Sequence, residues 1–381
     1  MKKKSFRKLA SLFTLACIMS AFLVLPVQAA TLNPVTPEVT EMLNNVLSSE
    51  LEIVKTGKSK DYSSVINESK LLQSIQKEEK YKENWYSDIS FKIDDYTSNV
   101  KVNNVTQLSD KKYDLDITFQ AELILSKDLQ IHPKTSEDYV CEIENKSGQW
   151  VINKLISKVD YQDIVKEKNN NITLANGNVI EPSADILANN DTILDAKSKD
   201  LQIRSTNIDA SVKSYKEMMQ GTKNTHLNGS EKATPSYAGT NSYAIANYAA
   251  AHGIDHNLNY YYYTSAEGGD CTNFASQAVH EGGVPTTSYW GPYTNNWIRV
   301  LEFHTYIINN GYAYDGNVNN ITLGDVVQWR HAYWDWSHST IASYYSDTYG
   351  WLLSAHTNDR SNYPISMYWG DYSYNRDFWF W

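Results

Sequence analysis

The stretch Gly268–Gly283, GGDCTNFASQAVHEGG, decides the fold of the C-terminal part of this chain. Small and apolar side chains recur in it at positions i, i+3, i+4, i+7 and i+8, namely Cys271, Phe274, Ala275, Ala278 and Val279. This spacing places them on one face of a helix, and Gly282 is a typical helix end. The sequence therefore predicts a helix that begins at Cys271.

The position of Cys271 at the start of a helix has a chemical meaning. The unpaired N–H groups and the positive end of the helix dipole stabilise a thiolate and can donate hydrogen bonds to an oxyanion. A buried cysteine that only fills an apolar face is the alternative, and it is common among free cysteines. A thiol nucleophile also needs a base, and the base needs an orienting partner.

Candidate partners for the thiol lie on strands predicted downstream, at 326–329, 338–345 and 351–358, with a turn at 346–350. Folding the last two strands about residue 348 sets His338 opposite a position between His356 and Asn358. Both lie on the face of His338, because cross-strand partners keep parity, whereas Asp359 has the wrong parity. We expect Cys271 as nucleophile, His338 as base, and His356 or Asn358 as orienter. Each histidine alone could instead be an ordinary surface or hydrogen-bonded residue.

A metal site is the main chemical rival to the thiol site. His331, His338, His356 and Asp359 could be assembled as ligands, and His252 and His256 are four residues apart. However, Gly253 weakens the helix that this pair would need, and no HExxH signature is present. We expect neither a metal nor another cofactor.

These residues resemble an amidase domain family of exported Gram-positive bacterial proteins, over about residues 237–381. The resemblance rests on the Gly268–Gly283 stretch and on three short segments, Gly324-Asp325-Val326, His338-Ser339 and Ala355-His356-Thr357-Asn358-Asp359. More distantly, the region is similar to the papain-like hydrolases of the NlpC and CHAP groups. The resemblance implies a helix that carries the nucleophile and packs on an antiparallel sheet, which presents the histidine and a third polar residue.

The resemblance also implies the role of each site residue. Cys271 corresponds to the nucleophile, and His338 to the general base that later acts as an acid. His356 falls where NlpC-type enzymes have their orienting residue, and Asn358 falls where CHAP-type enzymes carry an asparagine. The orienter stays open, because this sequence has both.

Asp270, next to the nucleophile, matches an acidic residue that helps NlpC-type enzymes to bind a free substrate amine. A helix N-cap is the simpler interpretation of Asp270. The upstream glutamine that supplies an oxyanion donor in papain has no clear counterpart here. We therefore expect the backbone N–H of Cys271, with a tyrosine from Tyr260–Tyr263, to supply these donors.

Composition divides the chain of 381 residues near residue 235. From Tyr237 to Trp381 there is no lysine, and nine of the eleven tryptophans fall there. We expect a signal peptide at 1–29, a small α+β accessory domain at 30–165, an Asn/Lys/Asp-rich linker at 166–235 with one weak helix near Ser214–Met219, and the amidase domain at 236–381. The predicted fold class of the whole chain is α+β.

The accessory region shows clear local patterns. An apolar helical spacing follows Thr36-Pro37 and ends at Gly57, and strict alternation over 115–125 predicts a half-buried strand. A hairpin follows, with its turn at Ser147-Gly148. Cys141 shares a strand face with apolar residues, so we expect it to fill the core.

The first residues predict export. Five basic residues and no acidic ones precede an apolar stretch at 9–25, as in a signal peptide. The small residues of Val27-Gln28-Ala29 fit cleavage after Ala29. A retained membrane anchor is the alternative, since the apolar stretch approaches the length of a membrane span. Cleavage would change the net charge from -10 to -15, which argues against nucleic acid as a partner. We expect a secreted or wall-associated monomer without stable membrane insertion.

The predicted function is that of an exported cysteine amidase or peptidase that forms a thioester at Cys271. The resemblance makes peptidoglycan, or its peptides, the expected substrate and partner. The alternative is a non-catalytic wall- or glycan-binding module. It would use the aromatic rings of Tyr289-Trp290, Trp334-Asp335-Trp336 and Trp379-Phe380-Trp381, which could stack on sugar faces or could instead fill the core.

Overall fold

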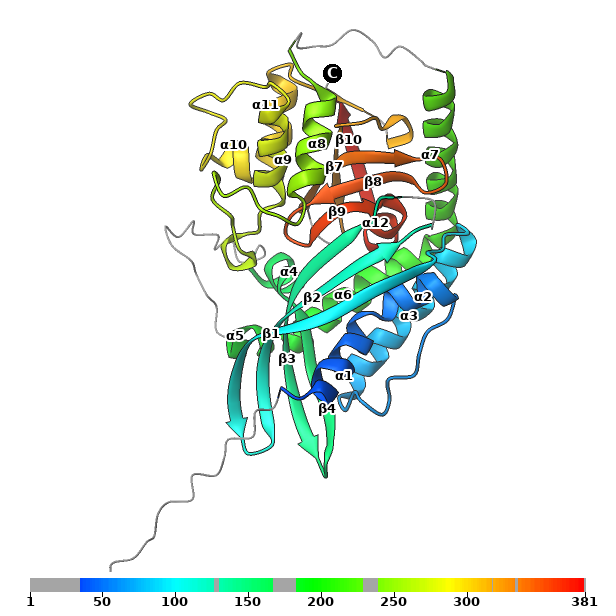
Figure 1. Cartoon of the computed structure of the whole chain (residues 1–381), viewed down its shortest axis with the longest axis vertical. Helices are drawn as coiled ribbons and strands as arrows, with labels where there is room; N and C mark the ends of the chain where they lie inside the picture. Colours follow the sequence, from blue (N-terminus) through cyan, green and yellow to red (C-terminus); the bar gives the residue numbers. More distant parts are fainter. Residues whose placement is uncertain are drawn as a thin grey trace, which may run out of the picture. The chain divides into compact units, whose positions relative to one another are not determined.

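The computed structural model describes residues 35–126, 130–166, 183–228, 239–316, 318–332 and 335–379, without the side chains of 223–228 and 379 (Figure 1). The signal peptide expected at 1–29 lies outside the described residues. From Pro37 on, the chain forms one compact unit of helices and a large antiparallel sheet. The α+β class is therefore confirmed. No helix in the described ranges is long and apolar enough to cross a membrane.

The sheet runs through both halves of the sequence. Its strand order is β1-β2-β3-β9-β8-β7-β6-β10-β5, and β4 pairs with β3. The bounds are β1 Asp95–Ser109, β2 Lys112–Ile124, β3 Lys134–Lys146, β4 Gln149–Ser157, β5 Tyr314–Asp315, β6 Val326–Arg330, β7 His338–Ser346, β8 Gly350–Ala355, β9 Asp359–Pro364 and β10 Tyr374–Trp379. All pairings between these strands are antiparallel.

The two halves meet where β3 pairs with β9. Lys134, Thr135 and Ser136 lie opposite Ser361, Arg360 and Asp359 in turn. The strands within residues 95–157 and those within residues 314–379 thus continue one sheet. This differs from the expectation of two domains joined by a linker.

The N-terminal patterns are largely confirmed. The helix expected up to Gly57 forms as α1 (Pro37–Leu47) and α2 (Ser49–Thr56), with Gly57 in the left-handed conformation at its end. The helix α3 (Ser69–Asp88) follows before the sheet. The predicted strand and hairpin form β2, β3 and β4, and Cys141 is fully buried in the core as expected.

The segment expected to be a linker is helical wherever it is described. It forms α5 (Ser183–Leu187), α6 (Asn190–Thr206) and α7 (Ile208–Asn228), after the short α4 (Lys158–Tyr161) and the π-helix η1 (Gln162–Lys166). Leu201, Tyr215 and Met218 from these helices lie in the main core. The apolar period was hard to see because α6 also buries two charged residues, Asp200 and Arg204.

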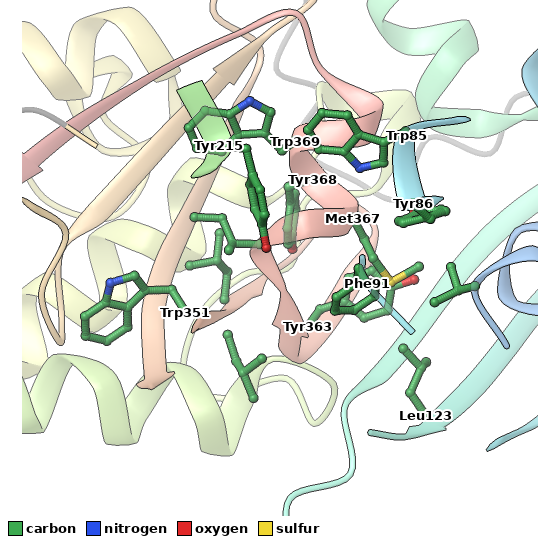
Figure 2. Close-up of a cluster of buried hydrophobic side chains, with 14 of the residues drawn as sticks. Trp85, Tyr86, Phe91, Leu123, Tyr215, Trp351, Tyr363, Met367, Tyr368 and Trp369 are labelled. Atoms are coloured by element: carbon green, nitrogen blue, oxygen red, sulfur yellow. The ribbon is translucent and has the colours of Figure 1, made fainter. Parts of the chain in front are cut away.

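The main core joins the N-terminal helices to the C-terminal strands (Figure 2). Trp85 of α3 is fully buried, and its indole N–H donates to the carbonyl oxygen of Ser366 at 3.0 Å. Ser366 belongs to α12 (Ile365–Asp371). Tyr215 of α7 packs edge-on against both Trp85 and Trp369. The C-terminal part, from residue 239 on, therefore shares its core with the preceding helices.

A second core lies on the opposite face of the C-terminal strands. There α8 (Ser242–His252) and α9 (Cys271–Glu281) lie side by side against β7 (Figure 1). The short helices η3 (Ser265–Glu267), α10 (Asn295–Ile298), α11 (Val300–Asn309) and η4 (Val318–Asn320) complete this region. Phe274 and Ala278 of α9 pack with Ile341 of β7 in this core. The predicted helix at Cys271 is confirmed, and Gly282 is its C-cap.

Candidate functional site

Cys271 begins α9 and points its thiol at the start of β7. The thiol donates to the carbonyl oxygen of Ser337 at 3.7 Å and lies 3.7 Å from the hydroxyl oxygen of Thr272. Ser337 directly precedes His338, so the sulfur lies against the backbone of the histidine strand. Only 6% of Cys271 is exposed, and burial raises the pKa of its thiol to about 11. In this structure Cys271 is a protonated thiol.

Thr357 holds the first turn of this helix. Its hydroxyl oxygen accepts the backbone N–H of Asp270 at 2.6 Å and that of Cys271 at 2.9 Å. Thr357 has a φ of 76°, which is uncommon for any non-glycine residue and strained for a β-branched one. Gly269 makes room for it, because a Cβ at Gly269 would approach Thr357 Cγ2 to 2.7 Å. The helix cap therefore comes from a residue that is 86 positions away in sequence.

This cap bears on the expected oxyanion donor. An N–H group at a helix start can bind the negative oxygen of a tetrahedral intermediate only if no other acceptor occupies it. In this structure the N–H of Cys271 already donates to Thr357. The predicted use of this N–H requires the Thr357 hydroxyl to move away.

His338 is the first residue of β7 and is buried, with 4% of its surface exposed. Its ring stacks on Tyr372 with an angle of 3° between the planes and on Tyr368 with an angle of 23°. Burial, and then the positive charges of Arg360 and His331, lower the pKa of His338 to about 3. Its Nε2 has no hydrogen-bond partner among the described residues. His338 is therefore a neutral imidazole with an unused ring nitrogen.

A β-bulge changes which residues share a face with His338. Ser346 pairs with Gly350 and Tyr344 with Leu352, but the register then shifts, and Ile341 pairs with Ser354. A shift of one residue moves every following side chain to the other face. The prediction that His356 shares the face of His338 is therefore wrong, whereas Asn358 lies in the turn after β8, where strand parity does not apply.

The contacts of neighbouring side chains agree with this correction. Ser339 directs its hydroxyl to Thr272 of α9, at 3.1 Å between the two oxygens. His356 stacks on Phe274 of the same helix, with ring centroids 4.1 Å apart. His338 instead faces the main core through Tyr368.

His356 is committed to a buried ion pair. Its Nδ1 lies 2.5 Å from Asp270 Oδ2, and its Nε2 lies 2.6 Å from the carbonyl oxygen of His252. Both partners are acceptors, so both ring nitrogens must donate, and the ring is an imidazolium. Burial lowers the pKa of His356, but the hydrogen bond and the charge of Asp270 outweigh it and raise the pKa. His356 does not contact His338 in this arrangement, and its predicted orienting role gains no support.

Both carboxylate oxygens of Asp270 also accept hydrogen bonds from buried groups of the protein. Its Oδ1 accepts the backbone N–H of Tyr263 at 2.9 Å and the amide of Asn273 at 2.7 Å, while Oδ2 accepts from His356. The residue is 1% exposed and makes no side-chain cap to its own helix. Asp270 thus occupies the N-cap position of α9, as the simpler interpretation expected, but its side chain does not cap the helix. Its carboxylate faces the protein interior, which leaves its predicted contact with a substrate amine unsupported.

Asn358 faces a cavity. It lies in the turn after β8, half-buried, and its Oδ1 has no partner among the described residues. The cavity has a volume of about 300 Å³, and Arg360 and Tyr372 also line it together with residues from β3, β4, α3 and α6. Tyr372 stacks on His338, so the cavity is one ring away from the candidate base. Neither Arg360 nor the cavity could be anticipated from a local sequence pattern.

One group of side chains has metal-like spacing among the residues that the structure describes. Candidate ligand atoms of His256, His356 and Asp359 all lie within 4.8 Å of one another. His356 as an imidazolium has no lone pair to offer, and Asp359 Oδ2 lies 2.7 Å from Nε2 of His256. The donor set thus fits a hydrogen-bonded cluster better than a metal centre.

Comparison with known proteins shows which family and which relative this chain is similar to. Residues 239–381 match the family model described as "Putative amidase domain". The matched region begins close to the domain boundary predicted at residue 236. A Bacillus subtilis (strain 168) protein named "Uncharacterized protein YjcM" is 33% identical over 146 residues. That match covers 37% of this chain and 32% of the relative, so the chain matches about a third of that protein's length. No solved structure matches.

Proposed function

We propose that residues 239–381 form an exported, papain-like cysteine amidase or peptidase that hydrolyses amide bonds in peptidoglycan or its peptides. One observation carries the proposal: Cys271 begins a buried helix, and its thiol lies 3.7 Å from the residue that precedes His338. The family match supports amide hydrolysis as the reaction class. The signal-like sequence before Ala29 supports export.

In the proposed reaction, Cys271 Sγ attacks the carbonyl carbon of the amide while its proton passes to His338. The C–N bond then breaks as His338 gives this proton to the leaving amine, and an acyl-thioester remains. Water attacks the thioester, again losing a proton to His338, and the acid is released as the thiol is restored. Each step conserves atoms and charge and needs no cofactor.

The resting ionisation states constrain the first step. A thiol with a pKa of about 11 and an imidazole with a pKa of about 3 do not form an ion pair at neutral pH. Proton transfer must therefore accompany C–S bond formation, or follow a rearrangement on substrate binding that exposes the pair. Displacement of the Thr357 hydroxyl from the N–H of Cys271 is the change that would also free an oxyanion donor.

The non-catalytic alternative has weaker support. Trp290, one of its proposed stacking residues, is fully buried. Trp334 and the side chains of 379–381 lie outside the described residues. Tyr289 and Tyr293 are exposed, but a binding module would have no use for a thiol at a helix start beside a histidine strand.

Digestion of purified muropeptides, followed by mass spectrometry of the products, tests the proposal. The secreted form of the chain should release new amine and carboxylate ends, and Cys271→Ala should lower the rate by about a thousandfold or more. His338→Gln should do the same. Cys141→Ala is the matched control, because Cys141 is the other buried free thiol and lies in the core of the N-terminal part. An active Cys271→Ala protein would exclude the thioester mechanism.

A further inference from the structure

Arg360 is a buried arginine whose charge is incompletely matched by the protein. It belongs to β9, and 8% of its surface is exposed. The guanidinium lies over the rings of Tyr363 and Tyr368, 4.5 Å from each centroid. Its Nε has no hydrogen-bond partner among the described residues. Burying such a group is costly unless an acceptor reaches its donors.

The other lysines and arginines that line the cavity beside Asn358 each have a carboxylate at hydrogen-bond distance, which Arg360 lacks. Lys82 pairs with Glu50 at 2.8 Å and also with Asp371, Lys197 pairs with Asp160 at 2.6 Å, and Arg204 pairs with Asp200 at 2.9 Å. The corresponding distance for Arg360 is 3.7 Å, from Nη2 to Asp371 Oδ2. Asp371 also pairs with Lys82, so its negative charge compensates that of Arg360 only in part.

The cavity wall places Arg360 near the candidate base. Arg360 exerts the largest charge effect on His338, and Tyr372 lies between the cavity and the His338 ring. Asn358, two residues before Arg360, contributes an unpartnered oxygen to the same wall. Among the charged groups of the wall, Arg360 is the cation without a close carboxylate partner, and Asn358 adds a neutral acceptor, within a volume of about 300 Å³ that can hold a small acyl group.

We propose that Arg360 binds a carboxylate of the substrate, so that the site selects amides whose acyl or amine portion carries a free carboxylate. Arginine suits this role because its planar donor fork matches a carboxylate, and the two tyrosine rings hold that plane in place. Eight carboxylates line the same cavity, and Lys82, Lys197 and Arg204 pair with five of them, which leaves Arg360 as the cation of this wall without a carboxylate at hydrogen-bond distance. This inference deepens the proposed function and rests on it.

Binding can be measured separately from catalysis. Full-length secreted protein with Cys271→Ala is titrated with N-acetylglycine and with its carboxamide, N-acetylglycinamide, by NMR or calorimetry. We expect the carboxylate to bind at least about tenfold more tightly, and Arg360→Gln to remove this preference. Arg360→Lys should lose most of it, because an ammonium cannot form the paired hydrogen bonds. Arg299→Gln, at a partly exposed arginine beside Glu302, should keep it.

Equal binding of the two probes by the parent protein, or a preference that survives Arg360→Gln, would overturn the inference. Circular dichroism and thermal melting show whether each variant is folded. Should Arg360→Gln unfold, Arg360→Lys decides, because it keeps the buried charge between the rings. A carboxylate preference in a protein that fails the muropeptide assay would contradict only the proposed reaction. Activity without the preference would contradict only the role of Arg360.

Discussion

The thiol of Cys271 and the ring of His338 are both neutral in this structure, for one physical reason. Each is at least nine-tenths buried, and burial disfavours the charged form of either group. The effect raises the pKa of the thiol to about 11 and lowers that of the imidazole to about 3. A position at a helix start favours a thiolate, but here it does not offset the loss of water. The structure is thus that of a resting nucleophile.

The rate of alkylation of Cys271 should depend on pH, because Cys271 is a protonated thiol at neutral pH. The thiolate fraction of a group with a pKa of about 11 rises about tenfold per pH unit below that value, so the rate with iodoacetamide should rise steeply from pH 6 to 9. The rate is measured on the Cys141→Ala protein by mass spectrometry, with circular dichroism at each pH to verify folding. A fast rate that stays level from pH 5 to 7 would show a thiolate–imidazolium pair and contradict the expectation.

At the scale of single elements, the sequence predicted the strands but not their register. Alternation and the turn at 346–350 locate β7 and β8, and the helical spacing locates α9. The hydroxyls of Ser343 and Ser354 at the bulge also bond to Asn362 of β9, which lies outside the hairpin. A pattern within one hairpin cannot contain those contacts. Local position was enough to suggest Cys271 and His338 as candidates, but it did not indicate the partners of His356 and Asp270.

The cap that Thr357 provides for α9 can be tested at the same scale. Thr357→Val keeps the shape but leaves the N–H groups of Asp270 and Cys271 without an acceptor, so it should destabilise the protein by about 1–2 kcal/mol. Thr357→Ser retains the oxygen and should lose much less. Urea unfolding of both variants gives the comparison. Equal stabilities of the valine and serine variants would show that the hydroxyl does not cap the helix.

At the scale of the whole molecule, the amidase-like region depends on what precedes it. The sheet passes from β3 to β9, and buried residues of α3 and α7 complete the core beneath α12. The composition change near residue 235 suggested a separate domain, because it reports surface and loop residues as much as the core. The burial of Asp200 and Arg204 explains why the intervening helices looked like a linker: Arg204 donates to Asp200, Glu78 and the carbonyl oxygen of Gly370.

Trp85 provides the test of this dependence, because it joins α3 to α12 from a fully buried position. Trp85→Ala leaves a large cavity and should cost about 3–5 kcal/mol, while Trp85→Phe keeps most of the ring and should cost less. Urea unfolding followed by circular dichroism should show one transition that moves to lower urea as a whole. Trp150→Ala, a partly buried position on β4, is the control and should have a smaller effect. Two separate transitions, with only the first moved by Trp85→Ala, would show that residues 239–381 fold independently of the preceding helices.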